Sequence, residues 1–100
     1  MNVCIFTGYF VEDPVIDFED NVEVVEFTLA VENHKGKFKL PSYLRFEAWD
    51  SGAKLIGSMG KKDRFITVSA TAKNYNPDLN YNQDIIFRVN EYLKSLKTVS

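Results

Sequence analysis

Residues 43–49 alternate between two kinds of side chain, and one of the two sets could bind a ligand. The apolar set is Leu44, Phe46 and Ala48. If these residues face a core, Tyr43, Arg45 and Trp49 project from the other face of the same strand. An exposed ring can stack on any nucleobase, which is worth about 1–3 kcal/mol per base, and a guanidinium can pair with a phosphate or stack on a base. Two features weigh against this interpretation: Trp49 could instead anchor a second small core or a subunit contact, and Glu47 would place an anion on the same face.

The same mixture of basic and aromatic residues recurs in two other places. Lys73 and Tyr75 share a face near the end of a later predicted strand, and Tyr81 follows in an Asn-rich loop. The loop that begins at Asn33 carries Lys35, Lys37, Phe38 and Lys39 next to His34. Lysines on such a loop suit a polyanion, because phosphate neutralisation gains free energy from counterion release. For any single lysine, simple solubility is the better explanation, whereas the set as a whole favours binding.

Catalysis and metal binding find little support in this sequence. Cys4 and His34 are the single residues of their types, whereas a zinc site needs several Cys or His at set intervals. No glycine-rich loop that could cradle a phosphate is present. We therefore predict a protein that is not an enzyme and that has no metal and no cofactor.

The 100-residue chain has a net charge of only −2, but its charges are unevenly distributed. Residues 1–34 contain eight acids and no Lys or Arg, whereas residues 35–100 contain all twelve basic residues and six acids. Such segregation can create a local positive surface on an acidic protein. The N-terminal apolar run lacks a basic region and is interrupted by Glu12 and Asp13, so we predict neither a signal peptide nor a membrane span. With one cysteine available, the sequence favours a reducing, cytoplasmic location.

Val, Ile, Phe, Tyr and Thr dominate the chain, which predicts an all-β protein with one short helix. The expected strands are 2–11, 23–33, 43–49, 64–75 and 84–93, and the expected helix is 50–60, weakened by Gly57. Besides the apolar set of 43–49, the expected core faces are Val25, Phe27, Leu29 and Val31, then Ile66, Val68, Ala70 and Ala72, then Ile85, Phe87 and Val89. Three strands, a helix and two strands is the order of an OB-fold, a five-stranded Greek-key barrel. We predict one such domain over residues 1–95, followed by a short tail, 96–100.

Several segments together resemble the bacterial and phage single-stranded-DNA-binding proteins (SSB). The first segment is VCIFTGYFVEDP, with Gly8 followed by the Asp13-Pro14 turn, and the second is VVEFTLAVEN. The third is YLRFEAWDSGAKL, in which Tyr43, Arg45 and Trp49 fit the family's spacing of aromatic, Arg and aromatic. The fourth is ATAKNY, which places Lys73 and Tyr75. The resemblance extends over about residues 3–93.

The resemblance implies sequence-nonspecific binding and protection of single-stranded DNA in replication, recombination and repair, with Tyr43, Trp49 and Tyr75 as stacking residues. It also implies self-association, as a homotetramer rather than a homodimer, with the edge of the first strand as a candidate interface. The chain ends in KSLKTVS without the family's acidic tip, so recruitment of replication proteins is not implied. Two alternatives stay open: an accessory protein of the primosomal PriB type, and an OB-type protein-interaction module without DNA binding.

Overall fold

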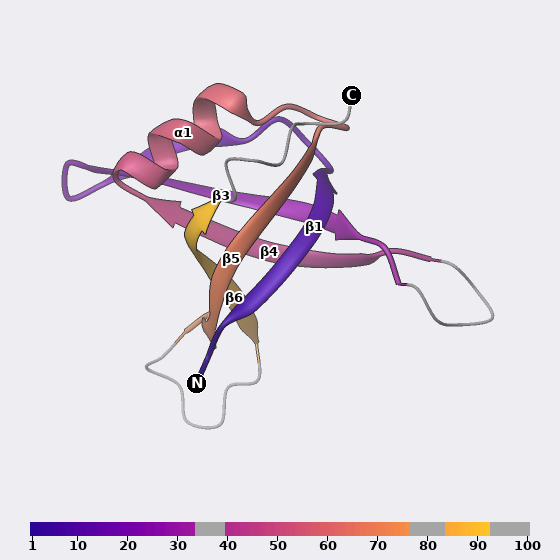
Figure 1. Ribbon diagram of the computed structural model, residues 1–100. Helices are drawn as coiled ribbons and strands as arrows, with labels where there is room; N and C mark the ends of the chain where they lie inside the picture. Colours follow the sequence, from indigo (N-terminus) through magenta and orange to yellow (C-terminus); the bar gives the residue numbers. More distant parts are fainter. Residues whose placement is uncertain (34–39, 77–83, 93–100) are drawn as a thin grey trace.

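The computed structural model describes residues 1–33, 40–76 and 84–92 (Figure 1). The elements are β1 (Cys4–Phe10), β2 (Val15–Glu19), β3 (Val22–Val31), β4 (Ser42–Trp49), α1 (Ser51–Met59), β5 (Phe65–Asn74) and β6 (Ile85–Tyr92). The strands form one sheet in the order β1-β5-β6-β4-β3-β2, and an additional β1–β3 pairing closes it. β4 and β6 are parallel, and the other neighbours are antiparallel. The predicted β-rich barrel with one short helix is confirmed.

Strand β2 is absent from the sequence-based prediction, which left residues 12–22 as a turn region. β2 pairs with residues 22–26 of β3, whereas β1 pairs with residues 29–31 of the same strand. β1 and β2 therefore lie along the same edge of β3 and together take the place of one bent strand. Counted in this way, the barrel closes with five strands as predicted. The β2–β3 turn consists of Asp20 and Asn21, whose positive φ angles of 51° and 66° suit a two-residue hairpin.

The core is built around phenylalanine rings on the inner faces of the strands. The ring of Phe46 is fully buried, and its centroid lies 5.4–5.6 Å from those of Phe6, Phe27 and Phe87. Edge-on and offset ring contacts at such distances stabilise a core beyond the area that they bury. The predicted core faces hold with one correction at the start of β6. Ile85 is 40% exposed because it lies at the end of the strand beside Asn74, while Ile86, on the other face, is buried.

Helix α1 covers one end of the barrel (Figure 1), with Ala53 and Ile56 as its buried residues. The helix forms as predicted despite Gly57. A Cβ at Gly57 would collide with the side chain of Ile16 on β2. This glycine therefore costs helix propensity but makes room for the packing of β2 against α1.

Gly8 lies between β5 and β3 and pairs with both strands, and a side chain there has no space. A Cβ on Gly8 would lie 2.6 Å from the carbonyl oxygen of Ala30. We expect Gly8→Ala to lower the free energy of unfolding by about 1–3 kcal/mol, measured by urea denaturation. The matched control is Gly52→Ala in α1, where the new Cβ meets only the Ala48 side chain at 3.8 Å and helix propensity improves. The two substitutions should shift the denaturation midpoint in opposite directions, and shifts of the same sign would contradict this account.

Candidate nucleic-acid interface

The outer face of β4 carries the aromatic and basic side chains that the alternation predicted. Tyr43 is 63% exposed, Arg45 is exposed and Trp49 is half-buried, whereas Phe46 and Ala48 on the inner face are fully buried. Residues two apart on a strand are about 7 Å apart, so this row spans about 20 Å. Among the described residues, no other ring or cation lies over Tyr43. β4 thus presents a strip of rings and charge long enough for several nucleotides.

Tyr75 joins this strip from the segment that follows β5. The guanidinium carbon of Arg45 lies 4.4 Å from the centroid of the Tyr75 ring, and the Tyr75 hydroxyl donates to Glu26 Oε1 on β3 at 3.2 Å. The charge of Glu26 and this hydrogen bond raise the pKa of the Tyr75 phenol above its ordinary value. Tyr75 therefore stays a neutral donor, held in place by Arg45 of β4 and Glu26 of β3.

Trp49 belongs to a second group, which is centred on the carboxylate of Glu47. Glu47 is only 8% exposed, and its Oε2 accepts from Trp49 Nε1 at 2.9 Å, Arg88 Nε at 2.7 Å and Lys73 Nζ at 3.3 Å. The guanidinium of Arg88 also lies over the Trp49 ring, 5.1 Å from its centroid. The anion that sequence analysis counted against binding is thus buried and paired with two cations, while it fixes the plane of the indole.

The ionisation of Glu47 follows from these contacts. Burial by itself would raise its pKa, but the hydrogen bonds from Trp49 and Arg88 and the charges of Lys73 and Arg88 outweigh that effect. The pKa therefore lies below the ordinary value of 4.5. A carboxylate with a lowered pKa in the folded state stabilises the fold above the unfolded-state pKa, and this stabilisation is lost as the pH falls through the folded-state value.

We therefore expect the stability difference between the wild type and Glu47→Gln to depend on pH in the acid range. The wild type should unfold at a higher temperature at pH 7, and its advantage should shrink below about pH 4.5 as Glu47 takes up a proton. Circular-dichroism melts at pH 7, 5 and 3 measure this difference. Glu12→Gln, an exposed carboxylate outside the group, is the control. A Glu47→Gln difference that stays constant across the three pH values would contradict the paired-carboxylate account.

Sequence analysis missed two members of these groups, Glu26 and Arg88, and also the structural role of Glu47. Arg88 could have been found, because it lies between Phe87 and Val89 and must face away from the core that they enter. Glu26 and Glu47 are register partners on β3 and β4, a pairing of two acids that no local sequence signal reveals. Of the predicted binding residues, Lys35, Lys37, Phe38, Lys39 and Tyr81 lie outside the described residues, as does His34.

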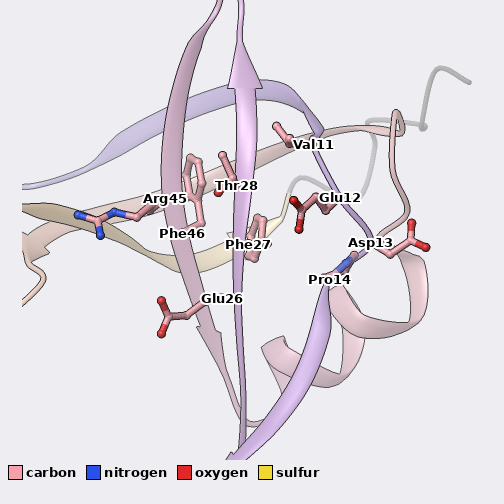
Figure 2. Close-up of a pocket in the computed structure, with 9 residues that line it drawn as sticks. All are labelled: Val11, Glu12, Asp13, Pro14, Glu26, Phe27, Thr28, Arg45 and Phe46. Atoms are coloured by element: carbon pink, nitrogen blue, oxygen red, sulfur yellow. The ribbon is translucent and has the colours of Figure 1, made fainter.

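A hollow of about 230 Å³ lies beside Arg45, between the Asp13-Pro14 turn and strands β3 and β4 (Figure 2). Its charged residues are Glu12, Asp13, Glu26 and Arg45. Figure 2 shows the guanidinium of Arg45 pointing away from Glu12 and Asp13. This guanidinium lies over the Tyr75 ring instead. The Asp13 carboxylate accepts from the Lys62 backbone N–H at 2.7 Å. These side chains do not converge on one point, so the hollow offers no arrangement suited to catalysis.

Two further searches of the described residues bear on the site. They hold no group of three His, Cys, Asp or Glu side chains that could bind a metal ion. No helix among them is long and apolar enough to cross a membrane.

Neither a protein-family model nor a curated protein matches the sequence, but solved structures match the fold. The SSB domain of a Synechococcus sp. protein superposes with a TM-score of 0.73 at 18% identity, covering 92% of this chain and 93% of that one. The chain has the OB-fold of an SSB domain. PriB from Ralstonia solanacearum also gives a TM-score of 0.73, at 9% identity, covering 93% of this chain and 97% of that one. The predicted OB-fold and the resemblance to SSB proteins are therefore confirmed at the level of the fold.

Proposed function

We propose that this OB-fold protein binds single-stranded DNA without sequence preference. One observation carries the proposal: Tyr43, Tyr75 and Trp49 lie on one outer face with Arg45 and Arg88 between and above them. Rings give stacking surfaces that accept every base, and the adjacent cations neutralise phosphates. The strip lies on the strand face that OB-folds use for oligonucleotides.

Each ring has a defined part in this binding. Tyr43 is exposed enough to stack on a base directly, whereas Tyr75 and Trp49 each have one ring face under a guanidinium. A base reaches the other face of these rings or stacks on the guanidinium itself, because Arg planes also stack on bases. Lys73 and Arg88 share a single anion, Glu47, so this group keeps a net positive charge for the phosphate backbone. The lysines at 35, 37 and 39 and the residues Phe38 and Tyr81 complete the proposed site.

A titration of Trp49 fluorescence with oligo-dT tests the proposal, with duplex DNA as the control and at low and high salt. Trp49 is the one tryptophan of the chain, so the signal reports on this position alone. We expect quenching by the single strand that weakens with salt and is absent with the duplex. If labelled oligo-dT also shows no binding by anisotropy, the proposed function is wrong and the protein-interaction module takes its place.

The salt dependence offers a second prediction, because Glu47 offsets part of the positive charge of Lys73 and Arg88. Glu47→Gln keeps the size of the side chain but removes the anion. We expect the slope of log affinity against log salt to steepen by up to about 0.7, the effect of one additional phosphate contact on a single strand. Oligo-dT titrations at four salt concentrations measure the slope. An unchanged or shallower slope would show that Lys73 and Arg88 do not face the phosphates.

The biological role follows from this activity: protection of single strands in DNA replication, recombination and repair, in the cytoplasm and without catalysis. The equally good superposition of PriB supports a second candidate, a primosomal accessory protein. Three aromatic platforms favour the general binder, since each platform adds affinity for any strand. Affinity that increases with oligo-dT length until all three platforms are occupied would support the general binder. Strong binding that requires a protein partner would support the accessory role.

Self-association belongs to the same proposal. β1 pairs with β3 only at residues 8–10, and no other strand among the described residues pairs with that side of residues 4–7. Val3 and Ile5 next to this edge are 56% and 64% exposed, and exposed apolar side chains at a free strand edge are typical of an interface. We propose that β1 pairs copies of the chain, as a homotetramer in preference to a homodimer. Light scattering of the wild type and of Ile5→Lys tests this assembly.

A further inference from the structure

The β2–β3 hairpin exposes apolar side chains that neither the core nor the proposed DNA site uses. Val15, Phe18 and Val22 are 75%, 65% and 38% exposed, and the hairpin turn projects beyond α1 (Figure 1). Soluble proteins rarely expose neighbouring apolar residues at this density unless something binds them. We call the outward part of this hairpin, residues 15–19 with Val22 and Val24, the hairpin surface.

The hairpin surface ends in an unpaired strand edge. β2 is the last strand in the sheet order, and no other described strand pairs with its outer side. The Phe18 N–H donates to its neighbour Asp17 Oδ1 at 2.8 Å. The carbonyl of Glu23, opposite Phe18, accepts from the backbone N–H of Asp50, the residue after β4. The Phe18–Glu23 pair is therefore not hydrogen-bonded. Hydrogen-bonded and non-hydrogen-bonded pairs alternate along an antiparallel ladder. The backbone N–H and C=O groups of Ile16 and Phe18 therefore point away from β3, where an added strand can pair with them.

Side chains along this edge are divided by chemistry. Asp17 and Glu19 lie on the outer face, with Val15 at its start, whereas Ile16 and Phe18 lie on the opposite face. A hollow of about 300 Å³ adjoins the acidic side and is lined by Val15, Asp17, Phe18, Glu19, Val24 and Glu26. Lys54 of α1 lies 3.7 Å from Glu23, and residues 1–34 themselves contain no Lys or Arg. The edge thus matches a strand that is basic on one face and apolar on the other.

Charge also indicates which class of molecule can bind the hairpin surface. Single-stranded DNA is repelled by the acidic outer face. A second copy that pairs through its own β2 brings the same acids against Asp17 and Glu19, and like charges directly opposite are destabilising. We propose that the hairpin surface is a docking site for an extended segment of another protein in which Lys or Arg alternates with apolar residues. Such a segment adds to β2 as a strand, with its apolar side chains beside Phe18 and its cations beside Asp17 and Glu19.

The test uses the full chain and a fluorescein-labelled octapeptide of alternating Lys and Val, titrated by anisotropy. We expect saturable binding that Val15→Thr/Phe18→Thr weakens at least about tenfold. Asp17→Lys/Glu19→Lys should weaken it by at least as much. The matched controls are Leu40→Thr, an apolar residue before β4 that is 70% exposed, and Glu12→Lys/Glu32→Lys, which changes the net charge equally. Both controls should bind the peptide within about threefold of the wild type. All of the substituted side chains are exposed, and amide exchange verifies that each variant is folded.

Amide exchange also locates the peptide. We expect it to slow exchange at Ile16 and Phe18, and oligo-dT should leave this protection in place. Several outcomes would overturn the proposal: no binding, equal loss in the variants and their charge-matched controls, or protection on another strand. Displacement by oligo-dT would overturn it too, because the peptide would then occupy the DNA face. So would a dimer that Phe18→Thr dissolves, since a second copy would then be the occupant. The peptide result does not depend on DNA binding, so failure of the proposed function and failure of this inference are distinguishable.

Discussion

Replacing Trp49 by Ala is expected to weaken the binding of single-stranded DNA by about 1–3 kcal/mol, which corresponds to roughly 5- to 150-fold in affinity. The substitution removes a stacking surface and also the ring that lies under Arg88. The loss should be similar for oligo-dT, oligo-dA and mixed sequences, because every base has a π-face. Anisotropy of a labelled oligonucleotide is the measurement, since the variant has no tryptophan.

Trp49→Phe separates stacking from positioning. Phenylalanine keeps a ring but loses the N–H that donates to Glu47. We expect it to retain most of the affinity lost in Trp49→Ala. Normal binding by Trp49→Ala would show that the site assignment is wrong even if the protein binds DNA. A Trp49→Phe variant as weak as Trp49→Ala would show that the hydrogen bond to Glu47, and not the ring, is the main contribution.

The second large effect is expected at Phe46, on the opposite face of the same strand. Phe46→Ala should lower the free energy of unfolding by about 3–5 kcal/mol, because its fully buried ring contacts three other phenylalanines. Such a loss is a large part of the total stability of a domain of this size. Chemical denaturation followed by circular dichroism measures it.

Phe18→Ala is the matched control, since Phe18 is 65% exposed on β2. We expect a change within about 0.5 kcal/mol, as for other exposed positions. Equal losses at the two positions would mean that the hairpin contributes to the core as much as the phenylalanine cluster does. A small loss at Phe46 would mean that the cluster is loosely packed.

The fold was predictable where the pattern of side chains is local. Alternation along residues 43–49 correctly assigned Phe46 to the inner face and Trp49 to the outer face of the strand. The order of the elements indicated the barrel. β2 was missed because Val15–Glu19 is short and exposes most of its side chains, so it lacks an apolar face that would mark a strand. The Asp20-Asn21 pair was the available signal, since these residue types tolerate the positive φ angles of a hairpin turn.

The candidate site was predictable only in part, for a related reason. Tyr43, Arg45 and Trp49 share one strand, so parity alone places them together. The Glu47 group gathers side chains from β4, β5 and β6, and the contact between Tyr75 and Glu26 spans 49 positions in the sequence. Such long-range pairings depend on the strand order and register, which a single sequence does not specify. Glu47 is a clear example: the sequence counted its charge against nucleic-acid binding, whereas the structure pairs it with Lys73 and Arg88.

The short parallel seam between β4 and β6 couples the binding face to the integrity of the barrel. Its register partners are Phe46 with Phe87 and Glu47 with Arg88, so one pair joins the core rings and the next joins the carboxylate to its guanidinium. A strand of DNA that holds Arg88 and Trp49 in place also holds this seam closed. The β4–β6 seam should therefore open more slowly in the bound protein than in the free protein. Slower amide exchange along β6 should then report that the binding face is occupied. If the proposed function is correct, a substitution at Arg88 should alter both DNA binding and the pairing of β6 with β4.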